Sequence, residues 1–115
     1  MTLPLLISFF LVFFLCQCAP ISKDIIQNDE NIPVVFTYLD GQAQKVCVTG
    51  SFNQWSSQSH CMKKDKNTWT LELSLPPGRY VYLFLVDDRI SKPDPGAVLT
   101  EESGFGTRNS ILVVE

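Results

Sequence analysis

Two alternating runs separated by a proline pair constrain the fold of this chain more than any other feature. Residues 68–75 (Thr-Trp-Thr-Leu-Glu-Leu-Ser-Leu) place apolar side chains on one face and polar side chains on the other. Residues 79–86 follow at once and are apolar on both faces, which is typical of a central strand or of one whose second face is covered. Pro76-Pro77-Gly78 between them cannot continue a strand. The pattern predicts two antiparallel strands joined by a turn.

Shorter runs of the same kind occur elsewhere in the chain. They cover residues 34–38, 45–49 and 110–114. Asp40-Gly41, Asp87-Asp88 and residues 92–96 are turn or breaker sequences, and we expect loops over residues 56–60 and 101–108. No helical period follows residue 33. We therefore predict an all-β chain, a small antiparallel β-sandwich of about six to eight short strands over residues 33–115.

The stretch Thr49-Gly-Ser-Phe-Asn-Gln-Trp55 ends one of these strands and holds the most informative aromatic residue. Gly50 and Asn53 favour a turn, which would swing Phe52 under the fold and leave Trp55 near the rim. A rim indole either caps a core or offers a flat apolar face with one N–H donor, on which a sugar ring can stack. The function of the chain depends largely on which of these uses Trp55 has.

The N-terminal segment differs from the rest of the chain in composition. Residues 3–15 are uncharged and mostly apolar, the length of a secretion signal and short for a membrane span. Leu15-Cys-Gln-Cys18 resembles the lipobox of bacterial lipoproteins, with Cys18 as the lipidated residue and Cys16 as the alternative. We expect a lipoprotein-type signal over residues 1–18 and a flexible tether over residues 19–32.

A cleaved signal without lipid and an uncleaved anchor are the alternatives for this segment. All three readings place the domain outside the cytoplasm, either anchored to a bacterial membrane by an N-terminal lipid or secreted. In such a compartment Cys47 and Cys61 either form a disulfide bond or remain two half-buried thiols. No metal-ligand spacing accompanies them, and we expect neither a metal site nor a cofactor.

Charge and histidine content argue against two further classes of function. The net charge is −3, and the only basic cluster, Lys63-Lys-Asp-Lys66, is expected to be a solvated turn rather than a nucleic-acid site. His60 is the only histidine, and no nucleophile–base pair or phosphate-binding loop accompanies it. We therefore expect no nucleic-acid partner and no catalytic activity.

Five pieces of the sequence, taken in order, resemble one known module. They are Gly50-Ser-Phe-Asn-Gln-Trp55, Trp69 with Leu73-Ser-Leu-Pro-Pro-Gly78, Tyr80-Val-Tyr-Leu-Phe-Leu-Val-Asp87, Asp94-Pro95 and Gly106-Thr-Arg-Asn-Ser110. The chain is similar to carbohydrate-binding module family 48, the isoamylase N-terminal early-set domain that also forms the glycogen-binding region of AMP-activated kinase beta subunits. The resemblance covers residues 33–115 and implies an immunoglobulin-like β-sandwich without catalytic residues.

The resemblance also implies a sugar site, which this sequence matches in part. Family binders use two tryptophans, a lysine, and a loop with an apolar residue, a threonine and an asparagine. Trp55 matches the first tryptophan, and the loop residues fall on Phe105, Thr107 and Asn109. Leu83 stands at the lysine position and Ile90 at the second tryptophan position. Arg89 or Lys92 could supply the missing donor from nearby.

Two functions follow as hypotheses. The first is an interaction or structural module, in which Leu83, Leu85 and Ile90 form an apolar face for a protein partner. The second is α-glucan binding through Trp55, Phe105, Thr107 and Asn109, with one aromatic platform and the lysine missing. Binding that Trp55→Ala abolishes would separate the two.

Overall fold

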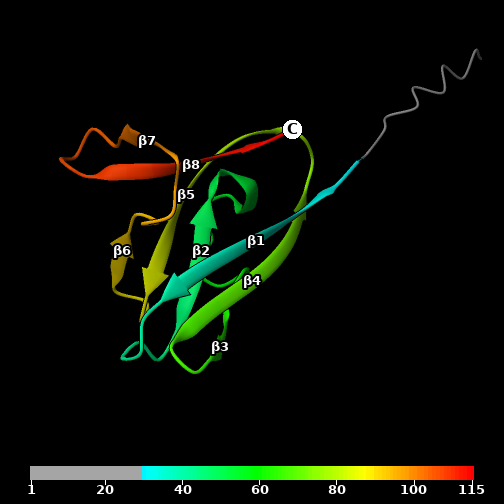
Figure 1. Ribbon diagram of the computed structural model, residues 1–115. Coiled ribbons are helices and arrows are strands. Elements are labelled where there is room, and N and C mark those ends of the chain that lie inside the picture. The colour runs from blue at the N-terminus through cyan, green and yellow to red at the C-terminus, as the bar shows by residue number, and fades with distance from the viewer. Residues whose placement is uncertain (1–29) are drawn as a thin grey trace, which may run out of the picture.

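Eight strands and one short 3₁₀ helix make up the part of the chain that the structure, a computed structural model, describes, which is residues 30–115 (Figure 1). The elements are β1 (Ile32–Leu39), β2 (Val46–Gly50), η1 (Ser51–Asn53), β3 (Lys63–Asp65), β4 (Thr68–Leu75), β5 (Gly78–Val86), β6 (Ile90–Lys92), β7 (Leu99–Glu102) and β8 (Arg108–Val114). All the strand pairs are antiparallel. The predicted all-β sandwich class is confirmed.

The strands form two sheets that pack face to face. One sheet has the order β1-β4-β3, and the other has the order β2-β5-β8-β7 with β6 added beside β5. In Figure 1, β1 and β4 run across β2 and β5. Residues 60–62 run along the free edge of β2, because Val48 N–H donates to the His60 carbonyl and Met62 N–H to the Val46 carbonyl. The chain then passes from this sheet to β3 in the other one.

The core lies between the two sheets and is built from the inward faces that the alternation predicts. Its buried members include Phe36, Val48, Trp69, Tyr82 and Phe84, from four different strands. Each strand residue that points inward removes apolar area from water, worth about 25 cal/mol per Å². The sandwich is therefore stabilised by burial of the apolar side chains that the alternation predicts on one face of each strand.

A polar tie fastens the connection between β6 and β7 to this core. The Tyr82 hydroxyl donates to Asp94 Oδ2 at 2.6 Å, and Asp94 N–H donates to the Ser110 hydroxyl at 2.7 Å. Burial, then the hydrogen bond to Asp94, raise the pKa of Tyr82 above its ordinary value, so the phenol stays protonated. Asp94 thus links β5 and β8 through its hydrogen bonds to Tyr82 and Ser110.

Strand β5 is central, and its second edge is shared by two strands. On one edge, β2 pairs with residues 82–86. On the other edge, β8 pairs with residues 78–82 and β6 with residues 84–86. Leu83 is therefore the one β5 residue without a cross-strand partner on that edge, although it faces Thr49 on the other. The sheet has a gap beside Leu83.

Three strands differ from the sequence expectation. β3 lies where a solvated turn over Lys63–Lys66 was expected, β7 lies partly in the expected loop over residues 101–108, and β6 was not predicted. All three are edge strands of three or four residues with mostly exposed side chains. Their pairing comes from hairpin geometry, and they carry no apolar alternation that could reveal them in the sequence.

The N-terminal expectations fall largely outside the described residues. The signal segment 1–18 with Cys16 and Cys18, and residues 19–29 of the tether, belong to the undescribed part, while β1 begins at Ile32. Within residues 30–115 there is no helix long and apolar enough to cross a membrane.

Candidate functional site

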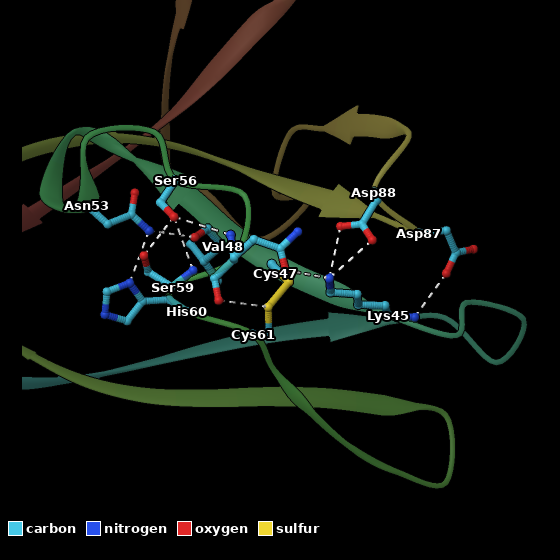
Figure 2. The surroundings of a disulfide bond; sticks show 11 residues. Lys45, Cys47, Val48, Asn53, Ser56, Ser59, His60, Cys61, Asp87 and Asp88 are labelled. Carbon is cyan, nitrogen blue, oxygen red and sulfur yellow. Dashed lines mark hydrogen bonds and ion pairs between the residues drawn. A yellow bond between two sulfur atoms is a disulfide. The ribbon is translucent and has the colours of Figure 1, made fainter.

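The loop that carries Trp55 is organised around the side chain of Asn53. Its Oδ1 accepts a hydrogen bond from Gly50 N–H at 3.0 Å, and its Nδ2 donates to the Val48 carbonyl at 2.9 Å. Nδ2 also lies 3.1 Å from His60 Nδ1, and Figure 2 shows these two side chains pointing toward one another. Because the Asn53 side chain is buried, these contacts replace hydration that it has lost. The asparagine of the turn sequence therefore holds the loop closed on β2.

After Asn53 the backbone adopts an uncommon conformation, and the Trp55 side chain is left partly exposed to solvent. Gln54 and Trp55 have φ values of 54° and 59°, in the left-handed region that non-glycine residues rarely occupy. Trp55 N–H donates to the Gly50 carbonyl at 2.9 Å, and Ser56 N–H donates to the Asn53 carbonyl at 3.1 Å. Strain of this kind persists only where neighbouring contacts fix the backbone. The result is an indole that is 46% exposed.

A disulfide bond closes the far end of this loop. Cys47 on β2 is bonded to Cys61, with a sequence separation of 14 residues (Figure 2). Of the two alternatives that the sequence left open for these cysteines, the structure therefore has the bridge. Phe52 packs on Phe36 and against His60 at ring-centroid distances of 6.0 and 5.6 Å, which places it under the fold as expected. His60 serves here as a packing and hydrogen-bonding residue.

We expect Asn53→Ala to lower the free energy of unfolding by about 2–3 kcal/mol. The substitution leaves Gly50 N–H and the Val48 carbonyl without their partner at a buried position, and each unsatisfied buried group costs about 1–3 kcal/mol. Urea unfolding followed by circular dichroism measures the change. Asn31→Ala, at an exposed position before β1, is the control and should leave the midpoint unchanged. Equal midpoints for the two variants would contradict the role assigned to Asn53.

The hairpin between β7 and β8 presents the second exposed aromatic residue. Gly104 and Gly106 have φ values of 86° and 79°, which glycine adopts freely, and Phe105 between them is 93% exposed. The hairpin is closed by Ser103 N–H donating to the Thr107 carbonyl at 3.0 Å and by the two hydroxyls of these residues 2.7 Å apart. The loop residue of the expected sugar site thus lies at a hairpin tip.

The gap beside Leu83 is an open groove of about 410 Å³. Its lining residues are Leu83, Ser91, Pro93, Thr100, Gly106, Thr107 and Arg108. It lies between β6 on one side and the β7–β8 hairpin on the other, with Leu83 between them. Its volume is within the usual range for small-molecule sites.

Of the residues expected at a sugar site, the groove brings together Leu83 and Thr107. Phe105 lies next to the groove residue Gly106 without lining the groove, and Asn109 is half-buried on β8 opposite Glu101. Trp55 lies on the other flank of β5, because its backbone is tied to the end of β2, where Thr49 faces Leu83. The expected residues therefore stand on both flanks of one strand rather than in one pocket.

The expected apolar interaction face is exposed only in part. Leu83 and Leu85 are half-buried, and Ile90, paired with Val86 at the start of β6, is the exposed member of the three. Leu85 lies between Cys47 and Ser91 in the sheet, so strands flank it on both sides. These three residues present less free apolar surface than the sequence alone suggested.

Arg108 is the one charged residue that lines the groove, and the sequence alone did not single it out. It belongs to the hairpin sequence Gly106-Thr-Arg-Asn-Ser110, but no spacing rule distinguishes it from Arg89 or Lys92. Its place becomes visible only when the pairing of β5 leaves the gap that Arg108 borders.

Two carboxylates in loops outside the groove accept hydrogen bonds from backbone N–H groups. Backbone N–H groups of Gln42 and Ala43 donate to Asp40 Oδ1 and lower the pKa of this carboxyl below its usual value. Asp87 Oδ1 likewise accepts hydrogen bonds from Gln44 and Lys45 N–H. Over residues 30–115, no group of three or more His, Cys, Asp or Glu side chains is placed to hold a metal ion.

Comparison with known proteins gives the family of this chain. Residues 32–115 match the sequence profile of the family described as "Glycogen recognition site of AMP-activated protein kinase". The chain belongs to this family. Its β-sandwich, which carries the groove and the two exposed aromatic residues, is the domain of this family and is called the glycogen-recognition domain below.

Two relatives show how much of a longer protein this domain represents. Protein FLOURY ENDOSPERM 6, a chloroplastic protein of Oryza sativa subsp. japonica, is 35% identical over 80 residues, which are 70% of this chain and 15% of that protein. The beta-1 subunit of 5'-AMP-activated protein kinase from Sus scrofa is 34% identical over 83 residues, which are 72% of this chain and 64% of that subunit. The glycogen-recognition domain thus spans less than two thirds of either relative.

A solved structure has the same fold. The maltogenic amylase from S. marinus aligns with a TM-score of 0.57 and 23% identity, covering 74% of this chain and 14% of the amylase. At that identity the likeness concerns the fold of the glycogen-recognition domain alone.

Proposed function

We propose that this chain is a non-catalytic α-glucan-binding module that works outside the cytoplasm, anchored to a membrane by a lipid on Cys18. The observation that carries the proposal is the exposure of Trp55 and Phe105 on opposite flanks of β5. Aromatic faces bind the apolar faces of sugar rings, and aromatic residues in solvent otherwise cost free energy. Membership of the glycogen-recognition family supports the same ligand class.

The lining of the groove is a second observation that supports the proposal. Between the two aromatic residues, Leu83 offers an apolar surface, and Thr100 and Thr107 offer hydroxyls beside it. Glucose units in an α-glucan have both apolar ring faces and ring-edge hydroxyls, which suits such a lining. Because the groove is open and the second tryptophan position holds Ile90, we expect weak binding at each single site. Binding gains strength where many membrane-anchored copies contact one glycogen particle.

Two observations favour a location outside the cytoplasm. The Cys47–Cys61 disulfide bond is typical of proteins in oxidising compartments. The uncharged residues 3–15 followed by Leu15-Cys-Gln-Cys18 fit export with lipidation at Cys18, or at Cys16. Metabolic labelling with a fatty-acid analogue, compared between wild type and Cys18→Ser, tests the anchor, since lipidation at Cys18 requires the label to disappear in the variant.

We expect Trp55→Ala to weaken binding of a soluble cyclic α-glucan by about tenfold or more. Truncating a central aromatic anchor removes about 1–3 kcal/mol of binding free energy, and each 1.4 kcal/mol is a factor of ten in Kd. Calorimetry with the cyclic α-glucan and native gels containing glycogen measure the loss. Leu39→Ala, at an exposed position on β1 in the other sheet, is the control and should bind as wild type does.

A β-linked glucan of equal length serves as the control ligand. Binding of the α-glucan alone supports the proposal, and wild type that binds neither glucan at millimolar concentration overturns it. That result would favour the hypothesis of an interaction module. Ile90 is the exposed member of the apolar face in that hypothesis, and it is the first position to examine for a protein partner.

A further inference from the structure

The groove beside Leu83 offers a ligand only one charged group. The family resemblance puts a lysine at position 83, and here leucine offers no hydrogen-bond donor. The other lining residues are neutral, and the single cationic side chain among them is Arg108. An inference about donors in this groove therefore concerns Arg108, and it rests on the proposed glucan function.

The guanidinium of Arg108 is fixed by one hydrogen bond, and most of its N–H donors have no protein acceptor in the described part of the chain. Its Nε donates to the Thr100 hydroxyl at 2.8 Å, across the β7–β8 hairpin. Its ion-pair contact, from Nη1 to Glu102 Oε1, is 3.8 Å, which is too long for a hydrogen bond. Of its five N–H donors, one is used within the described part of the chain. The remaining donors lie on a side chain that is 53% exposed.

The other exposed arginines are placed differently. Arg79 makes a direct ion pair with Glu101 at 2.8 Å and lies at the far end of β5. Arg89 sits in the turn between β5 and β6, beside the Asp87-Asp88 pair and away from the groove. Neither borders Leu83.

We propose that Arg108 is the hydrogen-bond donor that holds a glucose unit in the groove over Leu83. A planar guanidinium presents parallel N–H groups that suit two neighbouring ring hydroxyls, while Leu83 and Pro93 contact the apolar face of the ring. The hydrogen bond to Thr100 fixes the side chain before the ligand arrives, which reduces the ordering cost of binding. The donor thus comes from the hairpin strand β8 in place of the central strand β5.

The test compares three charge-neutralising variants in the full chain. Arg108→Gln, Arg79→Gln and Arg89→Gln are titrated with a cyclic α-glucan by calorimetry, in a non-glycosidic detergent because maltosides carry an α-linked glucose pair. We expect Arg108→Gln to raise Kd about tenfold, since a hydrogen bond from a charged donor has about that effect. Arg79→Gln makes the same charge change at a side chain of nearly the same exposure, and its Kd should stay within twofold of wild type. Arg108→Lys should recover part of the loss.

The outcomes separate this inference from the proposed function. Wild type that binds while Arg108→Gln binds equally well overturns the inference and leaves glucan binding intact. Wild type that binds no glucan overturns both. A loss in Arg89→Gln without one in Arg108→Gln assigns the donor to the β5–β6 turn and overturns the inference. Equal urea midpoints for Arg108→Gln and wild type show that a loss of binding is not a loss of fold.

Discussion

Phe84→Ala is expected to lower the free energy of unfolding by about 3–5 kcal/mol, the usual cost of deleting a buried phenyl ring. Phe84 is 0% exposed, lies on the central strand β5, and contacts the rings of Tyr38 and Tyr82 at centroid distances of 5.0 and 6.0 Å. Its removal opens a cavity between the two sheets that neighbouring strands cannot close without breaking their pairing. Urea unfolding followed by near-ultraviolet circular dichroism measures the change.

Phe105→Ala makes the same chemical change at the hairpin tip and serves as the matched control. Because Phe105 is almost fully exposed, its loss should shift the free energy of unfolding by no more than about 0.5 kcal/mol. Glucan affinity should fall in this variant under the proposed function. A destabilisation by Phe105→Ala close to that of Phe84→Ala would mean that the hairpin tip packs on the core, against the structure.

Removal of the disulfide bond is expected to cost about 3 kcal/mol. The bridge closes a loop with a sequence separation of 14 residues, and in the chain-entropy model such a loop restricts the unfolded chain by about that amount. For a domain of this size the thermal midpoint should fall by roughly 15 °C. Thermal unfolding of wild type with and without a thiol reductant, and of the Cys47→Ala/Cys61→Ala variant, measures the effect.

The reductant should leave the midpoint of that variant unchanged, which excludes an effect through Cys16 or Cys18. Because the bridge fastens the loop that carries Trp55, reduction should also weaken glucan binding. Coincident unfolding curves for oxidised and reduced wild type would contradict a structural role for Cys47 and Cys61.

Local sequence chemistry predicted most of the sandwich. The alternation in residues 68–75 matches β4 with the same bounds, and Trp69, Leu71 and Leu73 face the core as expected. The double-sided apolar pattern in residues 79–86 marked the strand that is central in its sheet, since β5 has neighbouring strands on both edges. Its second face carries Val81, Leu83 and Leu85, which are half-buried. The turn sequence after Gly50 placed Phe52 against the core and left Trp55 at the rim.

The candidate site was predictable only in part. Trp55, Phe105, Thr107 and Asn109 came from the resemblance, whereas Arg108 is visible only in the sheet. Likewise, Leu83 and Leu85 looked like a free apolar face in the sequence and are half-buried in the structure. Exposure depends on which strands flank a residue, and single-strand periodicity carries no such information.

By itself, the sequence determined which face of each long strand points inward and where the chain turns, since these depend on the order of neighbouring residues. Only the tertiary structure decided that β6 and β8 share one edge of β5, leaving a groove at Leu83. It also decided that Cys47 is bonded to Cys61. Likewise, it decided that Arg108 borders the groove with one of its five N–H donors used in a hydrogen bond within the described residues. Those features arise from pairs such as Tyr82 with Ser110 and Phe84 with Lys92, which are set by packing of the whole sheet rather than by local propensity.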